Sequence, residues 1–316
     1  MAAAKTILVF SFEENPFVTR LWLKGFLRYA KNCKWLVERI SCTAGRKMSC
    51  RKVKSLIRFH RADGVIVGCF DEMPQPALAG VPFVWMDPPV GQVPKTDSYV
   101  HHDGSAAAQL AAKELLHLNL THFAAVGDLP EREWSKARLA EFERRIRGKG
   151  SYDRMELVAS TADKVANIRQ IEPWLKRLPK PCGVFAVNDQ IGSAVISAAN
   201  RLGLRMPEEL AVVGVDNDED ICSMALPSLT SIATDWEKGG FCWERRWIGG
   251  CVTRPRRRSG ARSANWASSA APRQRPARFV STPASPKPAS SSANTPARES
   301  EWTTWSAAWA VRGGWR

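Results

Sequence analysis

The sequence predicts an α/β fold in which two doubly wound lobes each have a parallel sheet. Short apolar runs of strand length alternate with amphipathic helical segments from residue 5 to residue 241. Asparagine and aspartate residues directly follow several of these runs, where open parallel sheets bind ligands. The chain has 316 residues, which is long enough for two hydrophobic cores.

Residues 184–216 show this pattern most clearly. Residues 184–187 form an apolar run, and apolar residues then recur at helical spacing up to a second run at 211–216. We therefore expect one strand–helix–strand unit with parallel strands. Asn188, Asp189 and Asp216 follow the two strands and are candidate ligand contacts. Alternatively, Asn188 and Asp189 only cap the helix, a position that favours these residue types.

The first lobe is expected over residues 1–120. It opens with a strand at 5–12 and a helix at 16–31, and Glu13 and Asn15 lie in the loop between them. A helix at 53–60 and strands at 64–70 and 82–86 follow, whereas residues 33–50 lack a clear period. Glu13 and Asn15 are candidate site residues because this loop leaves the carboxyl end of a strand. A solvated loop is the alternative.

His101, His102 and Asp103 could be interpreted as a metal cluster. However, adjacent side chains of an extended segment point to opposite sides, and no spaced ligand follows. We therefore expect Asp103 to cap a helix that begins at Gly104. The sequence predicts no metal site and no cofactor.

The second lobe is expected over residues 121–234. It comprises a strand at 121–127, a helix that places Trp134, Arg138 and Phe142 on one face, a strand at 154–160 and a helix at 167–178. The strand–helix–strand unit completes it. Residues 226–234 are expected to lead back towards the first lobe. The return segment, residues 235–241, is expected to open a helix that packs on that lobe.

Three motifs carry a resemblance to a known family. These are A-x-N-D at 186–189, R-x-P-E-E-L-A-V-V-G-V-D-N at 205–217 and P-S-L-T-S-I at 227–232. Together they resemble the effector domains of LacI/GalR transcriptional regulators, which share their fold with periplasmic sugar-binding proteins. The resemblance implies a sugar, with a pentose preferred, bound between two lobes, operator DNA as the partner of the intact protein, and a homodimer.

The same resemblance places Arg138 opposite the bound ligand. A guanidinium fork suits sugar hydroxyls or a carboxylate. The alternative is that Arg138 lies on a surface helix within a basic stretch. The expected ligand contacts are thus Arg138, Asn188, Asp189, Asp216, Glu13 and Asn15.

The net charge of +15 is concentrated in the tail. Residues 241–316 hold 14 of the 46 basic and 3 of the 31 acidic residues, a net charge of +11, which leaves +4 for the rest. Residues 242–316 contain no leucine and no aspartate but 7 of the 13 tryptophans. Because this composition cannot form an ordinary core, we expect a disordered basic tail.

A frameshift near codon 241 would explain the tail. Tryptophan has a single codon, and reading it one base earlier gives leucine, methionine or valine. Back-reading the tail in this way restores helical periodicity in separate places and resembles the start of an AraC-type DNA-binding domain. An effector domain followed by such a domain resembles the xylose-operon regulators. The chain as translated would then have lost its DNA-binding domain.

Other classes of function are less well supported. A solute-binding protein of a sugar transporter would have the same fold, but no secretory signal is visible. No P-loop, G-x-S-x-G or H-E-x-x-H motif indicates an enzyme. The tail could also act as a nonspecific nucleic-acid arm. No apolar run approaches the ~20 residues of a membrane span, and the eight cysteines form no C-x-x-C pair, so we expect a cytoplasmic protein.

Overall fold

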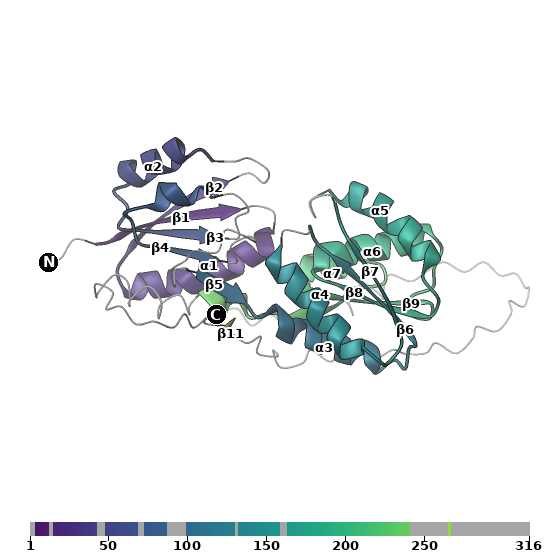
Figure 1. The fold of residues 1–316 in the computed structure, drawn as a ribbon. Helices are drawn as coiled ribbons and strands as arrows, with labels where there is room; N and C mark the ends of the chain where they lie inside the picture. Colours follow the sequence, from purple (N-terminus) through teal and green to yellow (C-terminus); the bar gives the residue numbers. More distant parts are fainter. Residues whose placement is uncertain are drawn as a thin grey trace, which may run out of the picture. The chain divides into compact units, whose positions relative to one another are not determined.

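The computed structural model describes residues 4–12, 15–42, 48–68, 73–86, 99–129, 132–158, 163–240 and 265–266, of which 12, 99–102 and 265–266 are described by their backbone alone. Within these residues the chain forms a six-stranded and a five-stranded sheet, and every strand pair is parallel. Helices accompany each sheet (Figure 1). The predicted fold class, two α/β lobes with parallel sheets, is confirmed.

The first sheet has the strand order β11-β5-β4-β3-β1-β2. Its elements along the chain are β1 (Thr6–Phe12), α1 (Pro16–Asn32), β2 (Leu36–Cys42), α2 (Cys50–Phe59), β3 (Gly64–Gly68), the 3₁₀ helix η1 (Gln75–Leu78), β4 (Phe83–Met86), β5 (Tyr99–His102) and β11 (Asn265–Trp266). Strand β2 lies in the stretch that showed no period. It is the last strand of the sheet, and most of its side chains are exposed or half-buried.

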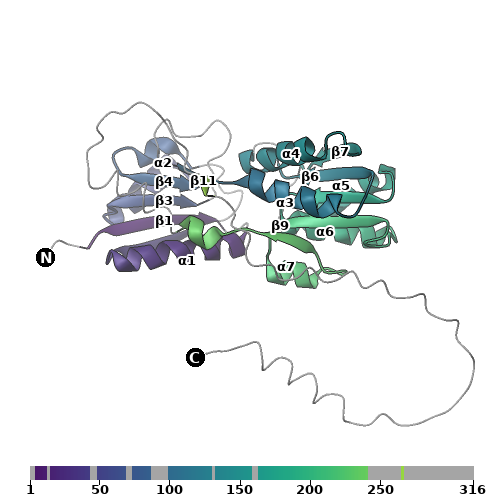
Figure 2. The same cartoon turned by 90° about the horizontal axis from the view of Figure 1, so that it is seen from below.

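Alternating side chains along β1 supply two separate cores. Ile7 and Val9 pack on one face of the sheet with α1, whereas Leu8 and Phe10 pack on the other face with α2 and η1. Successive strand residues point to opposite faces, so a sheet covered on both sides needs an unbroken apolar run. Figure 2 shows α1 running alongside β1.

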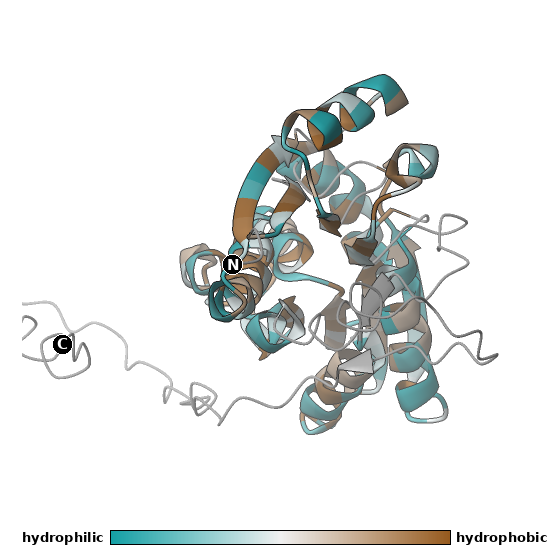
Figure 3. Cartoon of the chain, turned by 90° about the vertical axis from the view of Figure 1, so that its left-hand side faces the viewer, coloured by the Kyte–Doolittle hydropathy of each residue, from teal (hydrophilic) through white to brown (hydrophobic). Residues whose placement is uncertain are grey.

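The second sheet has the strand order β10-β9-β8-β6-β7. The elements of this lobe are α3 (Gly104–Leu116), β6 (His122–Gly127), α4 (Glu133–Ile146), β7 (Ser151–Glu156), α5 (Lys164–Arg177), β8 (Cys182–Ala186), α6 (Asp189–Arg201), β9 (Leu210–Asp216), α7 (Glu219–Met224) and β10 (Thr230–Ala233). Figure 3 faces the first lobe and shows hydrophilic and hydrophobic segments alternating along helices of the chain, as expected where one helix face covers a sheet.

Two details of the second lobe differ from the sequence predictions. The strand expected at 154–160 lies at 151–156, because this edge strand also includes the polar residues that precede Arg154. Helix α3 falls inside the range assigned to the first lobe. Its buried residues Ala107, Ala108 and Leu115 nevertheless pack in the same core as Phe123 of β6.

Asp103 has the role expected of it. Its side chain accepts a hydrogen bond from the Ala106 amide at 3.0 Å, which caps α3. Among the residues that the structure describes, no group of three or more histidine, cysteine, aspartate or glutamate side chains could hold a metal ion. No helix in the described part of the chain is long and apolar enough to cross a membrane.

Candidate ligand-binding site

Asp216 is the centre of the candidate site. It is the last residue of β9, and its side chain lies at the carboxyl end of the second sheet, only 5% exposed. Three side chains from distant parts of the chain approach its carboxylate. Arg138 Nη2 lies 3.7 Å from Oδ1, Trp236 Nε1 donates to Oδ1 at 3.3 Å, and Asn15 Nδ2 donates to Oδ2 at 3.5 Å.

The backbone at Asp216 is unusual. Its φ is +114°, and φ of the following residue Asn217 is +57°. Side chains with a Cβ atom rarely adopt positive φ, so the surrounding structure must hold this turn in place. Such residues concentrate at sites of function, and this one carries the buried carboxylate.

Arg138 is a buried residue of α4. Its exposed fraction is 2%, so its side chain lies on the buried face of this helix and not on the solvent-exposed face. The guanidinium carbon lies 5.0 Å from the ring centre of Trp134, one turn earlier on the same helix, and Nη1 donates to the backbone oxygen of Val187. The aromatic ring and this carbonyl therefore hold the cation beside Asp216 and next to the start of α6.

The electrostatics at Asp216 combine opposing effects. Burial raises its pKa to about 6, since a carboxylate loses hydration in the protein interior. The positive charge of Arg138 and the hydrogen bond from Trp236 act in the opposite direction and limit the rise. Asp216 therefore titrates near pH 6, and above that pH most molecules carry a negative charge on this side chain.

Asn188 caps helix α6. Its Oδ1 accepts a hydrogen bond from the Ile191 amide at 2.8 Å, as the capping alternative expected. Its backbone also follows Val187, whose carbonyl oxygen binds Arg138. The cap thus fixes Asn188 next to the Arg138–Asp216 pair, which leaves its amide nitrogen as the group of this side chain that a ligand could use.

Asp189 is buried, with an exposed fraction of 1%, and it interacts within its own lobe. Its Oδ2 accepts from the Asp218 amide at 2.8 Å and lies 3.6 Å from Cys222 Sγ, while Oδ1 accepts from Ser231 Oγ at 2.5 Å. Burial, followed by the charge of Asp216, raises its pKa to about 8. The structure therefore places Asp189 beside the site, under the turn that follows Asp216.

The structure brings together most of the predicted contacts. Arg138 and Asn15 both contact Asp216. Asn188 follows Val187, whose backbone oxygen binds Arg138, and Asp189 accepts from the amide of Asp218 in the turn after Asp216. Asn15 also caps α1, because its Oδ1 accepts from the Val18 amide at 3.1 Å. Glu13 lies outside the described residues.

Sequence reasoning missed Trp236, which lies within the predicted return segment. Its indole is 5% exposed and packs in the same core as Trp22 and Phe26 of α1 while it donates to Asp216. A helix begins here, and Asp235 Oδ1 accepts from the Lys238 amide at 2.9 Å. The only sequence signal for the contact is that a returning segment must pass close to the carboxyl end of β10.

Contacts with α1 hold this return segment. Glu237 pairs with Lys24 at 2.7 Å and with Arg28 at 2.8 Å. Gly240 packs so closely that a Cβ atom there would lie 1.9 Å from the backbone oxygen of Trp22. This close approach to α1 also fixes where Trp236 reaches Asp216.

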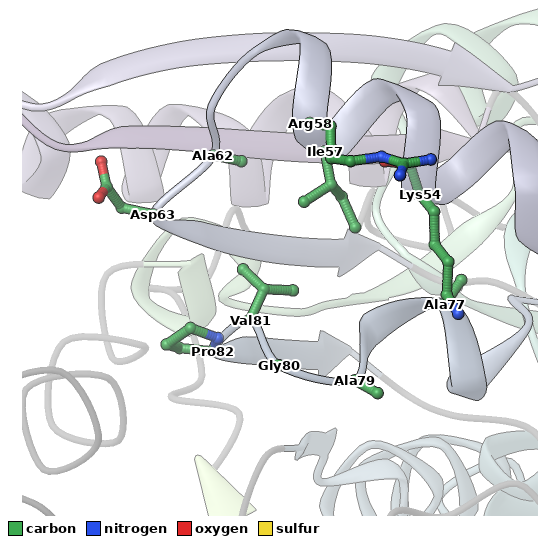
Figure 4. A pocket seen from close by; sticks show the side chains of 10 residues that line it. All are labelled: Lys54, Ile57, Arg58, Ala62, Asp63, Ala77, Ala79, Gly80, Val81 and Pro82. Carbon is green, nitrogen blue, oxygen red and sulfur yellow. The ribbon is translucent and has the colours of Figure 1, made fainter.

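Two surface pockets of the first lobe lie away from this site. One, of about 450 Å³, is lined by residues of α2 and by the segments that precede β3 and β4, among them Lys54, Arg58 and Asp63 (Figure 4). The other, of about 840 Å³, lies along α1 and reaches Arg39 of β2. Neither is lined by a predicted ligand contact, although Pro16 next to Asn15 lines the second.

The second lobe matches a known protein family. Residues 112–242 match the family described as the periplasmic binding protein-like domain. The xylose operon regulatory protein of Escherichia coli strain K12 is 29% identical over 194 residues, which cover 57% of this chain and 48% of that protein. The transcriptional regulator CelR of Thermobifida fusca is 29% identical over 157 residues, covering 49% and 45%.

Solved structures extend the similarity to both lobes. The complex of the regulator CelR with cellobiose has a TM-score of 0.65 at 20% identity and covers 80% of each chain. A LacI family transcriptional regulator from Mycobacterium smegmatis has a TM-score of 0.67 at 18% identity, covering 79% of this chain and 92% of that one. At this identity the similarity shows the fold, which is that of LacI-type effector domains.

The chain spans about half the length of the curated relatives it matches. These relatives are transcriptional regulators rather than enzymes, in agreement with the prediction from sequence.

Proposed function

We propose that this chain is the sugar-binding effector part of a transcriptional regulator and that it binds its ligand at Asp216. The buried Arg138–Asp216 pair at the carboxyl end of β9 carries the proposal, because Asn15 and Trp236 converge on the same carboxylate. Open parallel sheets bind ligands at this edge. The curated relatives and solved structures of the same fold are regulators, which supports this class of function.

The chemistry of the site suits a polyol. Asp216 supplies acceptors, and Arg138 and Asn188 supply donors, so vicinal hydroxyl groups can bind in pairs. The Trp236 indole adds an apolar face beside the carboxylate. A pentose such as D-xylose is the proposed ligand, supported by the name of the Escherichia coli relative, and cellobiose is the competing candidate from CelR.

Binding would change the contacts that Asp216 makes with the rest of the protein. A sugar hydroxyl on this carboxylate competes with Asn15 and Trp236, which belong to α1 and to the return segment. A ligand shifts a conformational equilibrium when its affinity differs between the two states. Sugar binding would in this way alter lobe closure, and an attached DNA-binding domain would respond through its affinity for operator DNA.

The remaining proposals concern the intact protein. We place it in the cytoplasm as a homodimer that binds operator DNA, and we attribute residues 242–316 to a frameshift that replaced an AraC-type domain. Resequencing the gene across codons 235–260 tests the frameshift. An unchanged reading frame would contradict it. The alternative, a solute-binding protein of a sugar transporter, would have the same fold. The relatives reported above are transcriptional regulators, so they favour the regulator over this alternative.

Calorimetric titration of the full chain with D-xylose tests the proposed site. We expect binding by the wild-type chain and at least a tenfold loss of affinity in Asp216→Ala, because hydrogen bonds to a charged group contribute about 1.5–3 kcal/mol. Asp163→Ala is the matched control, since Asp163 caps α5 outside the site and accepts from the Ala166 amide. Undiminished binding by a folded Asp216→Ala chain would exclude the site.

A further inference from the structure

The turn after β9 needs support from outside itself. Asp216 and Asn217 both have positive φ, a conformation that persists only when surrounding contacts impose it. The backbone amides of Asn217 and Asp218 donate to side chains and not to the backbone of a neighbouring strand. Asn217 N donates to Ser231 Oγ at 3.0 Å, and Asp218 N donates to Asp189 Oδ2 at 2.8 Å.

These two hydrogen bonds converge on one carboxyl group. Ser231 Oγ, which accepts from Asn217, donates its own hydrogen to Asp189 Oδ1. Asp189 thus holds the Asp218 amide directly and the Asn217 amide through Ser231. Because Ser231 belongs to β10, the same carboxyl group also ties the turn to the strand that leads out of this lobe.

Tight packing fixes the position of the Asp189 carboxyl group. It lies over Gly214 of β9, where a Cβ atom would come within 2.3 Å of Asp189 Oδ1. Gly214 is the residue paired with Ser231 in the register of β9 and β10. A side chain at position 214 would therefore occupy the space of the carboxyl group, and glycine is what allows it to reach both neighbours.

We propose that Asp189 is a positioning residue: it clamps the Asp216–Asp218 turn to β10 and thereby sets the orientation of the Asp216 carboxylate. It acts through Asp218 N and Ser231 rather than through a contact with the ligand. The clamp itself rests on geometry alone, and only its effect on sugar affinity rests on the proposed function. Movement of Asp216 would then be transmitted to β10 and onward to Trp236.

Amide hydrogen exchange of the full chain tests the clamp without any ligand. We expect Asp189→Ala to speed exchange at Asp218 about tenfold or more, because the acceptor of this buried hydrogen bond is removed. Ser231→Ala should do the same at Asn217, whereas Ser231→Thr, which keeps the hydroxyl group, should restore protection. Gly214→Ala should speed exchange at both positions, and the matched cap variant Asp163→Ala, which loses its own hydrogen bond to the Ala166 amide, at neither.

A second readout connects the clamp to the site. Asp189→Ala and Ser231→Ala should each weaken D-xylose binding about tenfold, and the double variant should lose no more than Asp189→Ala alone, because both side chains act in one network. Wild-type exchange rates at Asp218 in a folded Asp189→Ala chain would overturn the proposal. If that variant does not fold, wild-type exchange at Asn217 in Ser231→Ala overturns it. If the wild-type chain binds neither D-xylose nor cellobiose, the proposed function fails, and the exchange rates alone decide on the clamp.

Discussion

A single carboxylate, that of Asp216, is in contact with groups from three separate regions of the chain. Arg138 comes from α4, Asn15 from the start of α1 and Trp236 from the return segment. Their convergence means that the charge on Asp216 depends on its neighbours. Burial favours the neutral acid, and the Arg138 cation favours the carboxylate.

Replacing Arg138 tests this balance. Without the guanidinium, burial acts unopposed by the cation, so Arg138→Met should raise the pKa of Asp216 above its value of about 6. Carboxyl ¹³C shifts followed from pH 4 to pH 9 measure the change. Arg145→Met is the matched control, because Arg145 lies on the same helix but pairs with Glu141. An unchanged Asp216 titration in Arg138→Met would show that the pair has no electrostatic role.

At this scale, sequence reasoning identified the residues with local signals. Asn188 and Asp216 directly follow apolar runs, so their positions could be predicted from the sequence pattern. The position of Arg138 was instead predicted from the resemblance to LacI/GalR regulators. The partner of Asp189 could not, because Ser231 lies 42 residues away and no local pattern pairs them. Trp236 was missed for the same reason, since its contact with Asp216 exists only once the chain has returned.

Among the elements, the return segment has the most consequential packing. Glu237 pairs with two cations on α1, yet Lys24 and Arg28 are largely exposed, so these pairs contribute little. Gly240, in contrast, lies against the backbone of α1 with no room for a methyl group. Close packing rather than charge therefore determines how this segment docks.

Two substitutions separate these contributions. Gly240→Ala should destabilise the protein by about 1–3 kcal/mol, the usual cost of forcing extra atoms into packed structure. Glu237→Gln should cost less than about 1 kcal/mol, as expected of exposed ion pairs. Urea denaturation of the full chain measures both, and Gly240→Ala should also alter the fluorescence of the nearby Trp236. The reverse ranking would mean that charge holds the segment.

Elements with a regular apolar period were predicted well, and those at sheet edges were not. The strands that later proved to be β1, β3, β4, β8 and β9 are buried on both faces and appear as apolar runs. Strand β2 combines exposed and half-buried residues, and β7 includes polar residues at its start. An edge strand needs less apolar surface, so its sequence carries a weaker signal.

For the whole molecule, shifted carboxyl groups predict a stability maximum at mildly acidic pH. Burial raises the pKa of Asp189 to about 8 and that of Asp216 to about 6, so the stability they contribute is complete at low pH and is lost as pH rises through these values. Hydrogen bonds from Arg144 lower the pKa of Glu141 to about 2, and its smaller contribution is lost as pH falls below about 4.5.

Melting temperatures between pH 3 and pH 9 measure this profile. We expect the maximum near pH 4, with a decline towards pH 9 that is reduced in Asp189→Asn. Glu141→Gln should reduce only the acidic decline, and weakly, because its arginine partners are well exposed. A melting temperature that rises steadily from pH 5 to pH 9 would contradict the buried state of both aspartates.

Strand β2 has a consequence for the behaviour of the protein at high concentration. It is the last strand of its sheet, and Leu36 on it is 58% exposed. An edge strand of this kind is a template on which further chains can assemble into aggregates. Glu38 and Arg39 are exposed on the same strand, and charged side chains there oppose such stacking. The charges of these two residues therefore help to keep the protein soluble, although neither residue contributes to the core or to the candidate site.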